Sequence, residues 1–217
     1  MRYELVIFDL DGTLLDTTEG IVEAVSHTID KNHLPELSED RLLEFIGPPV
    51  QESFKDKYGV DAERAQQLAD DFRQYYKEET LLLARPYDGI YDTLDGLVEK
   101  GIKVAVATYK REDYAVKLLK HYGFDRYSDM LYGADNENKL TKGDIIQKCI
   151  TSSMVSGLDK VLMVGDSVHD LKGARAIGVD FVGVTYGFGF KEPHEISGDG
   201  VIGSCKESIE LLGLVED

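Results

Sequence analysis

The sequence of 217 residues predicts a doubly wound, mostly parallel α/β sheet with a small all-helical domain inserted after the first strand. Short apolar runs alternate with helical patterns over most of the chain, which is typical of parallel strands that are covered on both faces. Between residues 16 and 83 this alternation stops, and only amphipathic stretches occur. We therefore expect a catalytic core of residues 1–15 and 84–217, and a helical cap domain of residues 16–83.

Four apolar runs are too short for helices and too continuous for half-exposed strands. The first follows the N-terminus without a small-residue cleavage site, so we interpret it as a strand and not as a signal peptide. The predicted strands are residues 5–8, 104–107, 161–164 and 181–184. The helical patterns of the core are residues 90–100, 112–122, 142–153 and 168–177.

The inserted segment shows three helical patterns and carries sixteen acidic and seven basic residues, which is −9 of the net charge of −17. Residues 85–89, Arg-Pro-Tyr-Asp-Gly, are expected to be the hinge through which the chain returns to the core. The apolar positions of the three patterns are Ile21, Val25 and Ile29; Leu42, Leu43, Phe45 and Ile46; and Ala65, Leu68, Ala69 and Phe72.

The composition, 42% hydrophobic and 30% charged, is that of a globular protein. A surface with a net charge of −17 repels phosphate backbones, so nucleic acid and anionic membranes are poor partners. A bound metal ion can reverse the local field, which leaves room for a small phosphorylated metabolite. No apolar run approaches the roughly 18 residues of a membrane span. Cys149 and Cys205 are expected to be free thiols, and these features together predict a cytoplasmic protein.

Polar residues follow three of the predicted strands. Asp9 and Asp11 follow the first strand, Thr108 the second, and Asp166 and Asp170 the third. Because ligands of open α/β sheets lie outside the carboxyl ends of the strands, we expect the four carboxylates to converge there. Like charges at such short range are costly unless a cation lies among them. Mg²⁺ accepts carboxylate, carbonyl and water oxygens, so the pattern predicts a magnesium site.

These segments resemble the four motifs of the haloacid dehalogenase-like hydrolase superfamily, in the expected order. Asp9-Leu10-Asp11-Gly12-Thr13 is similar to the first motif, Thr108 to the second, Lys142 to the third and residues 165–170 to the fourth. The insert resembles the small helical cap of the phosphoglycolate phosphatase and β-phosphoglucomutase subgroup. The resemblance spans the whole chain. It implies a Mg²⁺-dependent phosphatase that hydrolyses a small phosphomonoester through an aspartyl-phosphate.

The resemblance also implies a role for each residue. Asp9 would attack phosphorus, and Asp11 would protonate the leaving oxygen and then deprotonate the attacking water. Lys142 and the Thr108 hydroxyl would bind the phosphoryl oxygens, and Lys142 would also contact Asp9. Gly12 would permit the bend after the nucleophile, and the Thr13 hydroxyl would hold it.

Mg²⁺ would be bound by the carboxylates of Asp9 and Asp166 and by the backbone carbonyl of Asp11. Asp170 lies one helical turn after Asp166 and would act beside the metal or through water. Each site residue also has a purely structural alternative: Asp11-Gly12 as a turn, Asp166-Ser167 as a helix N-cap, Thr108 as a cap, His169 as a loop histidine, and Lys142 as a solvated lysine with Lys139 as its competitor.

The sequence departs from the family pattern at two places. Tyr109 and Lys110 follow Thr108 where Asn is common, and Lys110 adds a positive charge. Gly143 follows Lys142 where Pro is common, which leaves the reach of Lys142 open.

Two further segments have open roles. Gly47-Pro48-Pro49 interrupts the helical pattern, because proline is excluded from a helix interior. It is either a substrate-specificity loop that contacts the leaving group or a plain turn. Residues 186–190, Tyr-Gly-Phe-Gly-Phe, are either an aromatic loop beside the site or part of the core.

Other functions remain as alternatives. A phosphomutase of the same fold needs cap groups that hold a bisphosphate, and the insert shows no distinctive basic cluster. A C–Cl hydrolase has no use for Asp11, and no cap lysine lies in an apolar setting that would mark a phosphonate hydrolase. A regulatory binding protein that retains the fold has no need of the carboxylates at positions 9, 11 and 166. A monomer or weak homodimer is expected from the fold alone.

Overall fold

The computed structural model describes residues 2–135 and 139–216. The chain divides into two compact units. The first, which we call the sheet unit, comprises Met1–Asp16 and Pro86–Asp217. The second, the helical unit, comprises Thr17–Arg85.

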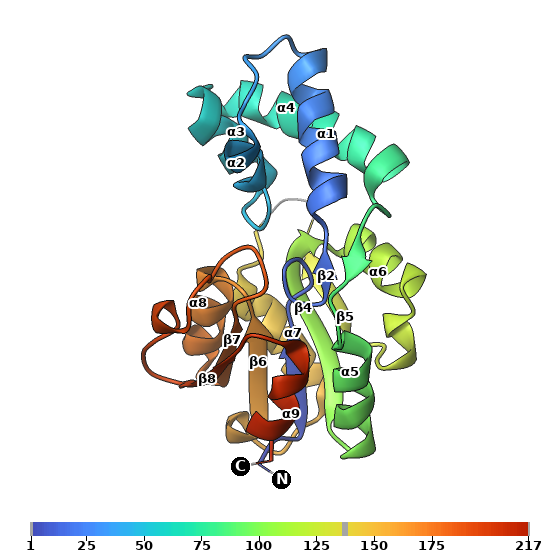
Figure 1. Ribbon diagram of the computed structural model, residues 1–217, viewed down its shortest axis with the longest axis vertical. Helices are drawn as coiled ribbons and strands as arrows, with labels where there is room; N and C mark the ends of the chain where they lie inside the picture. The colour runs from blue at the N-terminus through green and yellow to red at the C-terminus, as the bar shows by residue number, and fades with distance from the viewer. Residues whose placement is uncertain (1, 136–138, 217) are drawn as a thin grey trace. The chain divides into compact units, whose positions relative to one another are not determined.

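Six parallel strands form the sheet, in the order β5-β4-β1-β6-β7-β8 (Figure 1). The four predicted strands are confirmed as β1, β4, β6 and β7, and the fold class is the predicted one. The edge strands β5 and β8 were not predicted. The bounds are β1 Leu5–Phe8, β4 Lys103–Arg111, β5 Leu131–Ala134, β6 Val161–Gly165, β7 Asp180–Val184 and β8 Val201–Cys205.

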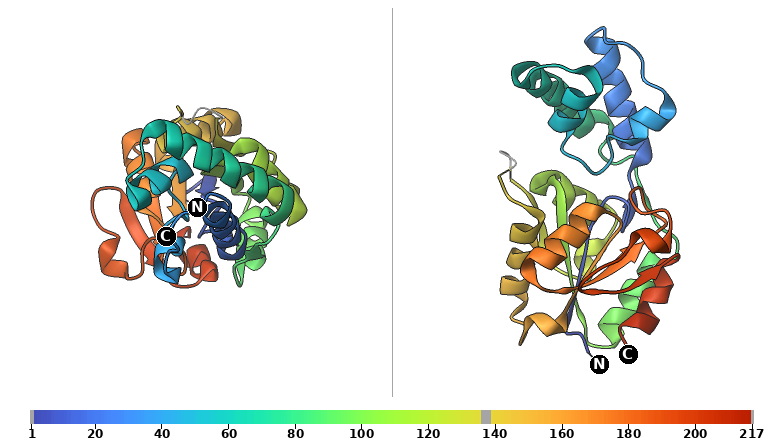
Figure 2. Two further views of the ribbon diagram at one scale, coloured as in Figure 1. Left: turned by 90° about the horizontal axis from the view of Figure 1, so that it is seen from above. Right: turned by 90° about the vertical axis from the view of Figure 1, so that its left-hand side faces the viewer.

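Helices cover both faces of this sheet. Helices α7 and α8 lie side by side on one face, and α5 packs with α9 on the other (Figures 1 and 2). The inward side chains of α7, among them Ile145 and Ile146, join the strand residues Leu5 and Met163 in one buried cluster. The helices are α5 Ile90–Glu99, α6 Glu112–His121, α7 Lys142–Ser153, α8 Val168–Ile177 and α9 Leu211–Leu214, and the first four confirm the predicted patterns.

A two-stranded ribbon forms where the chain leaves the sheet unit and returns to it. Strands β2 (Leu15–Asp16) and β3 (Arg85–Pro86) pair with each other. Strands of two residues are too short for any periodicity in the sequence to reveal them.

The helical unit contains four α-helices and a π-helical turn. Two of its three predicted helical patterns are confirmed, because their apolar residues are buried on α1 and α4. The second pattern was partly wrong: α2 ends at Leu43, and Phe45 and Ile46 are buried beyond its end. Helix α3 was not predicted, since Phe54 is its only buried apolar side chain. The elements are α1 Thr18–Lys31, α2 Glu39–Leu43, α3 Val50–Tyr58, α4 Ala62–Tyr75 and the turn Tyr76–Thr80.

Both cysteines are free thiols, as predicted, and both are buried. Burial raises the pKa of the Cys149 and Cys205 thiols to about 12, which keeps them protonated and unreactive. Among the described residues, no helix has the length and apolar character needed to cross a membrane.

The packing of α7 on the sheet can be tested at adjacent residues. Ile146→Ala removes a fully buried side chain and should lower the free energy of unfolding by about 2–5 kcal/mol. Gln147→Ala, one position along on the exposed side of the helix, should change it by less than about 0.5 kcal/mol. Urea titration followed by circular dichroism measures both values. Equal effects would contradict the assigned inward face of α7.

Candidate active site

Asp9 lies where β1 ends between two longer neighbours. Phe8 is aligned with Val106 of β4 and with Val164 of β6, and the Asp9 N–H donates to the Val164 carbonyl at 2.9 Å. This register brings Asp9 to the carboxyl edge of the sheet. Its side chain is buried there, with 8% of the residue exposed.

The chain turns sharply after Asp9. Gly12 has a φ of +81°, and a Cβ at this position would collide with the Asp166 carboxylate, so a glycine is required. The turn is closed by the backbone, since the Leu10 carbonyl accepts from the N–H groups of Leu14 at 2.9 Å and Leu15 at 3.0 Å. The Thr13 hydroxyl was expected to hold this turn. That expectation was wrong: the hydroxyl is buried without a hydrogen-bond partner in the described structure.

Lys142 joins two of the carboxylates. Its Nζ lies 2.7 Å from Asp9 Oδ1 and 2.6 Å from Asp170 Oδ1, and the lysine is 2% exposed. The alternative of a solvated lysine is therefore wrong. Lys139, the competitor, uses its backbone N–H to contact Asp135 at 3.1 Å.

The start of α7 fixes the position of Lys142. Thr141 and Asp144 form a capping box, in which the Thr141 hydroxyl accepts from the Asp144 N–H and the Asp144 carboxylate accepts from the Thr141 N–H. The Lys142 N–H donates to the Tyr109 hydroxyl at 3.0 Å. Gly143 in place of proline thus does not prevent Lys142 from beginning the helix.

Asp166 and Asp170 follow β6. The Asp166 Oδ2 accepts backbone N–H groups from Phe188 at 2.6 Å and from Gly189 at 2.9 Å. Ser167 is the N-cap of α8, and Asp170 Oδ2 accepts from its N–H at 3.1 Å and its hydroxyl at 2.7 Å. Capping therefore involves Ser167 and Asp170, not Asp166.

Three carboxylates meet closely enough to hold a metal ion. Asp9, Asp166 and Asp170 each offer an oxygen within 4.8 Å of the others, and all three are buried. Burial, with the charges of Asp170 and Asp166, outweighs Lys142 and raises the pKa of Asp9 to about 8. Burial and Asp170 likewise raise the pKa of Asp166 to about 6. A cation among these oxygens would favour their charged forms, so the donor set fits a hard divalent ion.

Lys142 alone does not balance these charges. Burial opposes its charge, but Asp170 and Asp9 outweigh burial and hold the pKa of the lysine above its usual range. When all three carboxylates are ionised, one ammonium leaves two negative charges. One divalent cation neutralises them.

The Asp11 carboxylate points to a different partner. Its Oδ1 lies 3.0 Å from Lys110 Nζ, and both side chains are largely buried. Lys110 thus brings a second cation to the site, as its position in the sequence suggested.

Thr108 was expected at the end of its strand, but β4 continues to Arg111, with irregular pairing between Ala107 and Arg111. The Thr108 hydroxyl is buried and accepts the Lys110 N–H at 3.1 Å. His169, expected in a loop, lies in the first turn of α8, and its ring and that of Tyr109 form a T-shaped pair with centroids 5.7 Å apart. Burial lowers the pKa of this histidine.

Gly47, Pro48 and Pro49 lie in the helical unit, immediately before α3. Gly47 has a φ of +102°, and Gly47 and Pro48 are exposed. These residues connect α2 to α3, a position that fits both a plain turn and a specificity loop.

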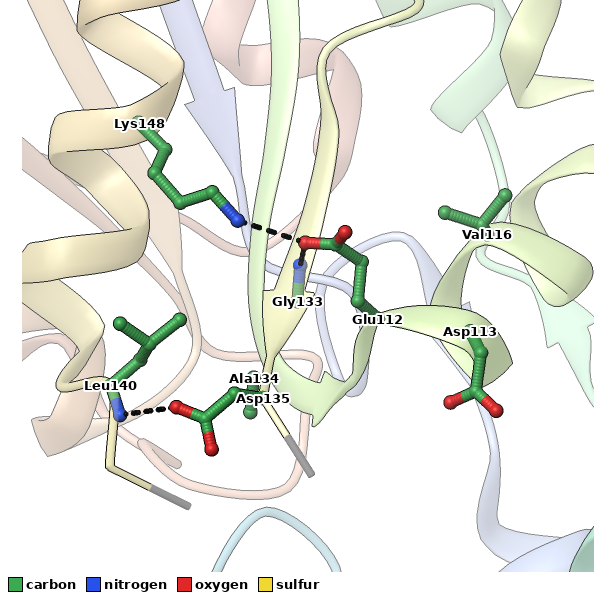
Figure 3. Close-up of a pocket in the computed structure, with 8 residues that line it drawn as sticks. All are labelled: Glu112, Asp113, Val116, Gly133, Ala134, Asp135, Leu140 and Lys148. Atoms are coloured by element: carbon green, nitrogen blue, oxygen red, sulfur yellow. Dashed lines mark hydrogen bonds and ion pairs between the residues drawn. The ribbon is translucent and has the colours of Figure 1, made fainter. Parts of the chain in front are cut away.

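A separate pocket of about 540 Å³ lies beside β5, α6 and α7 (Figure 3). Two of its carboxylates accept from other lining residues: Glu112 Oε2 accepts from Lys148 Nζ at 3.1 Å and from the Gly133 N–H at 3.2 Å, and Asp135 accepts the Leu140 N–H at 2.9 Å. Asp9, Asp11, Asp166 and Asp170 do not line it.

Comparisons with known proteins identify the family of the chain. A family model described as haloacid dehalogenase-like hydrolase matches residues 6–184. The chain is 35% identical to a 5'-nucleotidase of Pseudomonas aeruginosa, over 88% of this chain and 87% of that protein. It is 31% identical to the pyrophosphatase PpaX of Halalkalibacterium halodurans, over 99% of each. The crystal structure of a predicted phosphatase from Clostridium acetobutylicum superposes with a TM-score of 0.90 at 33% identity, covering 100% of this chain and 99% of the other.

The charge balance of the site predicts unequal effects at two lysines of α7. Lys142→Met leaves buried carboxylates without their cation and should lower the free energy of unfolding by about 3–5 kcal/mol in a chelating buffer. Lys148→Met breaks an exposed pair with Glu112 and should cost no more than about 1 kcal/mol. Urea titrations of both variants measure the difference. A loss at Lys142 as small as that at Lys148 would contradict the charge balance described here.

Proposed function

The chain belongs to the haloacid dehalogenase-like hydrolases, and we propose that it is a Mg²⁺-dependent phosphatase that hydrolyses a small phosphomonoester through an aspartyl-phosphate on Asp9. One observation carries the proposal. A buried lysine contacts two carboxylates, at 2.7 Å and 2.6 Å, while a third offers an oxygen within 4.8 Å of theirs. Such a group of ionisable residues is costly to bury without a ligand. It lies at the carboxyl ends of the strands, where open α/β sheets bind their ligands.

In the first half-reaction, a carboxylate oxygen of Asp9 forms a bond to phosphorus. The bond between phosphorus and the ester oxygen breaks. The leaving oxygen keeps the electron pair of that bond and takes a proton from Asp11. In the second half-reaction Asp11 accepts a proton from water, whose oxygen attacks phosphorus. The bond to Asp9 then breaks, which releases phosphate and returns Asp9 to its carboxylate and Asp11 to its protonated form.

Lys110 forms an ion pair with Asp11, the proposed acid and base. In the structure its Nζ holds the Asp11 carboxylate at 3.0 Å, which limits the side chain to one direction. Asp11 can exchange protons with substrate only in a geometry that keeps its other oxygen accessible. We propose that Lys110 orients Asp11 in this way.

Asp9, Asp166 and the Asp11 backbone carbonyl are proposed to hold the metal, with Asp170 beside them or linked through water. When bound, Mg²⁺ screens the charge of Asp9 from the phosphate and stabilises negative charge on the transferred phosphoryl group. Lys142 keeps Asp9 fixed and adds a positive charge of its own. The Thr108 hydroxyl is proposed as a further donor to a phosphoryl oxygen.

The helical unit is proposed to be the cap that selects the substrate, with domain limits at residues 16–83, and Gly47-Pro48-Pro49 is proposed to contact the leaving group. The net charge of −17 supports a small metabolite as substrate rather than a nucleic acid. The names of two relatives add a nucleoside 5'-monophosphate and pyrophosphate as compounds to test.

The chemistry predicts distinct losses at the two aspartates of the first motif. Asp9→Asn should abolish phosphate release, and Asp11→Asn should reduce kcat by about 10²–10⁴-fold. Asp159→Asn, an exposed residue just before β6, is the matched control and should leave the rate unchanged. Phosphate release with Mg²⁺, with and without a chelator, measures these rates. Turnover that survives Asp9→Asn would exclude the nucleophile, and turnover that survives the chelator would exclude the metal.

The proposed cap loop predicts a change in preference rather than in overall rate. Pro48→Ala with Pro49→Ala should alter the ratio of kcat/KM between substrates by about tenfold. The panel contains a nucleoside 5'-monophosphate, a sugar phosphate, phosphoglycolate and pyrophosphate. Pro35→Ala, another exposed proline of the helical unit, is the control. If the ratios stay constant in the loop variant, the loop has no part in specificity.

A further inference from the structure

The aromatic loop, residues 186–190, follows β7 and lies against the site without supplying a charged group to it. Two of its backbone N–H groups, from Phe188 and Gly189, donate to the same oxygen of Asp166, at 2.6 Å and 2.9 Å. Two donors on one carboxylate oxygen fix the rotation of that side chain. They also solvate its charge without any cation.

The loop contacts Asp166 so closely that side chains are excluded at two positions. A Cβ on Gly187 would lie 2.5 Å from Asp166 Cβ and 2.6 Å from its Oδ2, and would collide with the Gly12 carbonyl. A Cβ on Gly189 would collide with the Asp166 carbonyl. Neither glycine has a left-handed φ, so close contact and not backbone strain is what requires glycine here.

The same loop is also anchored to the turn that follows the nucleophile. The Tyr186 hydroxyl donates to the Thr13 carbonyl at 3.0 Å, and the Phe190 N–H donates to the Asp166 carbonyl at 2.7 Å. The loop therefore holds two segments that are far apart in the sequence: the turn after β1 and the residue after β6.

We propose that residues 186–190 are a positioning element that holds Asp166 against the turn after Asp9 and thereby sets the affinity of the site for its divalent cation. This inference rests on the metal site of the proposed function. A ligand that is already oriented loses little freedom when the ion binds, and groups that orient metal ligands typically change metal affinity by about 10–100-fold. The loop itself contacts neither the metal nor the phosphate in this proposal.

Direct titration of Mg²⁺ into the full chain, by isothermal calorimetry, tests the proposal without reference to activity. Gly187→Ala should weaken binding by about 10–100-fold while the protein stays folded. Gly96→Ala is the control: its Cβ would come within 2.7 Å of the Leu212 side chain, where α5 meets α9, so it introduces a close contact away from the carboxylates. It should change the melting temperature but not the affinity for Mg²⁺.

A one-atom change keeps the test valid if Gly187→Ala does not fold. Tyr186→Phe removes only the hydroxyl that donates to Thr13 and should weaken Mg²⁺ binding by about two- to tenfold. Tyr132→Phe removes a hydroxyl that is bonded to Ser152 at 2.7 Å and should have no effect on it. In both loop variants, phosphatase activity should recover at high Mg²⁺ with a kcat near that of the wild type.

The outcomes separate the two proposals. If the wild-type protein binds no Mg²⁺, the metal of the proposed function is wrong. If the wild type binds Mg²⁺ and the folded loop variants bind it equally well, the loop inference is overturned while the proposed function stands. A lower melting temperature with unchanged affinity would likewise overturn it, because the loop would then serve stability alone.

Discussion

The ammonium of Lys142 between Asp9 and Asp170 is the interaction on which the site depends. A buried carboxylate loses its hydration, and several kcal/mol of that loss must be recovered from neighbouring charges. Lys142 supplies this at two oxygens, 2.7 Å and 2.6 Å away, but a third carboxylate remains within 4.8 Å of theirs. Burial, together with the charges of Asp170 and Asp166, raises the pKa of Asp9 to about 8 despite Lys142. A site with this much unbalanced charge is prepared for a cation and for the phosphoryl group that the cation attracts.

The sheet makes this arrangement possible. Because β1 lies between β4 and β6 and Phe8 is aligned with Val164, Asp9 and Asp166 follow neighbouring strands at the same edge of the sheet. Helices α7 and α8 lie side by side. A Cβ on Gly173 of α8 would come within 2.8 Å of the Lys142 side chain, so glycine leaves room for the lysine. The lysine therefore reaches Asp170 of α8 and Asp9, which follows the central strand β1.

The sequence predicted the parts of the structure that depend on side-chain type. Continuous apolar runs mark strands that are buried on both faces, and these were found. The edge strand β5 has only Leu131 and Tyr132 as large apolar residues, and β8 has Gly203 and Ser204 in its middle, so neither forms a continuous apolar run. The carboxylates of the site can be recognised in the sequence, because aspartates follow the predicted strands. The N–H groups of Phe188 and Gly189 cannot be recognised in this way, because every residue except proline has a backbone N–H. Only the fold directs these two N–H groups at Asp166.

The two departures from the family pattern show which property of the site is required. Asparagine after Thr108 and proline after Lys142 are both replaced, yet Lys142 reaches Asp9. The Tyr109 hydroxyl accepts the Lys142 N–H, and the Thr141 capping box starts the helix without proline. Different local interactions thus place the same ammonium within hydrogen-bond distance of the same carboxylate. The constraint acts on the position of the charge, and the residues that support it are free to differ as long as α7 begins at Lys142.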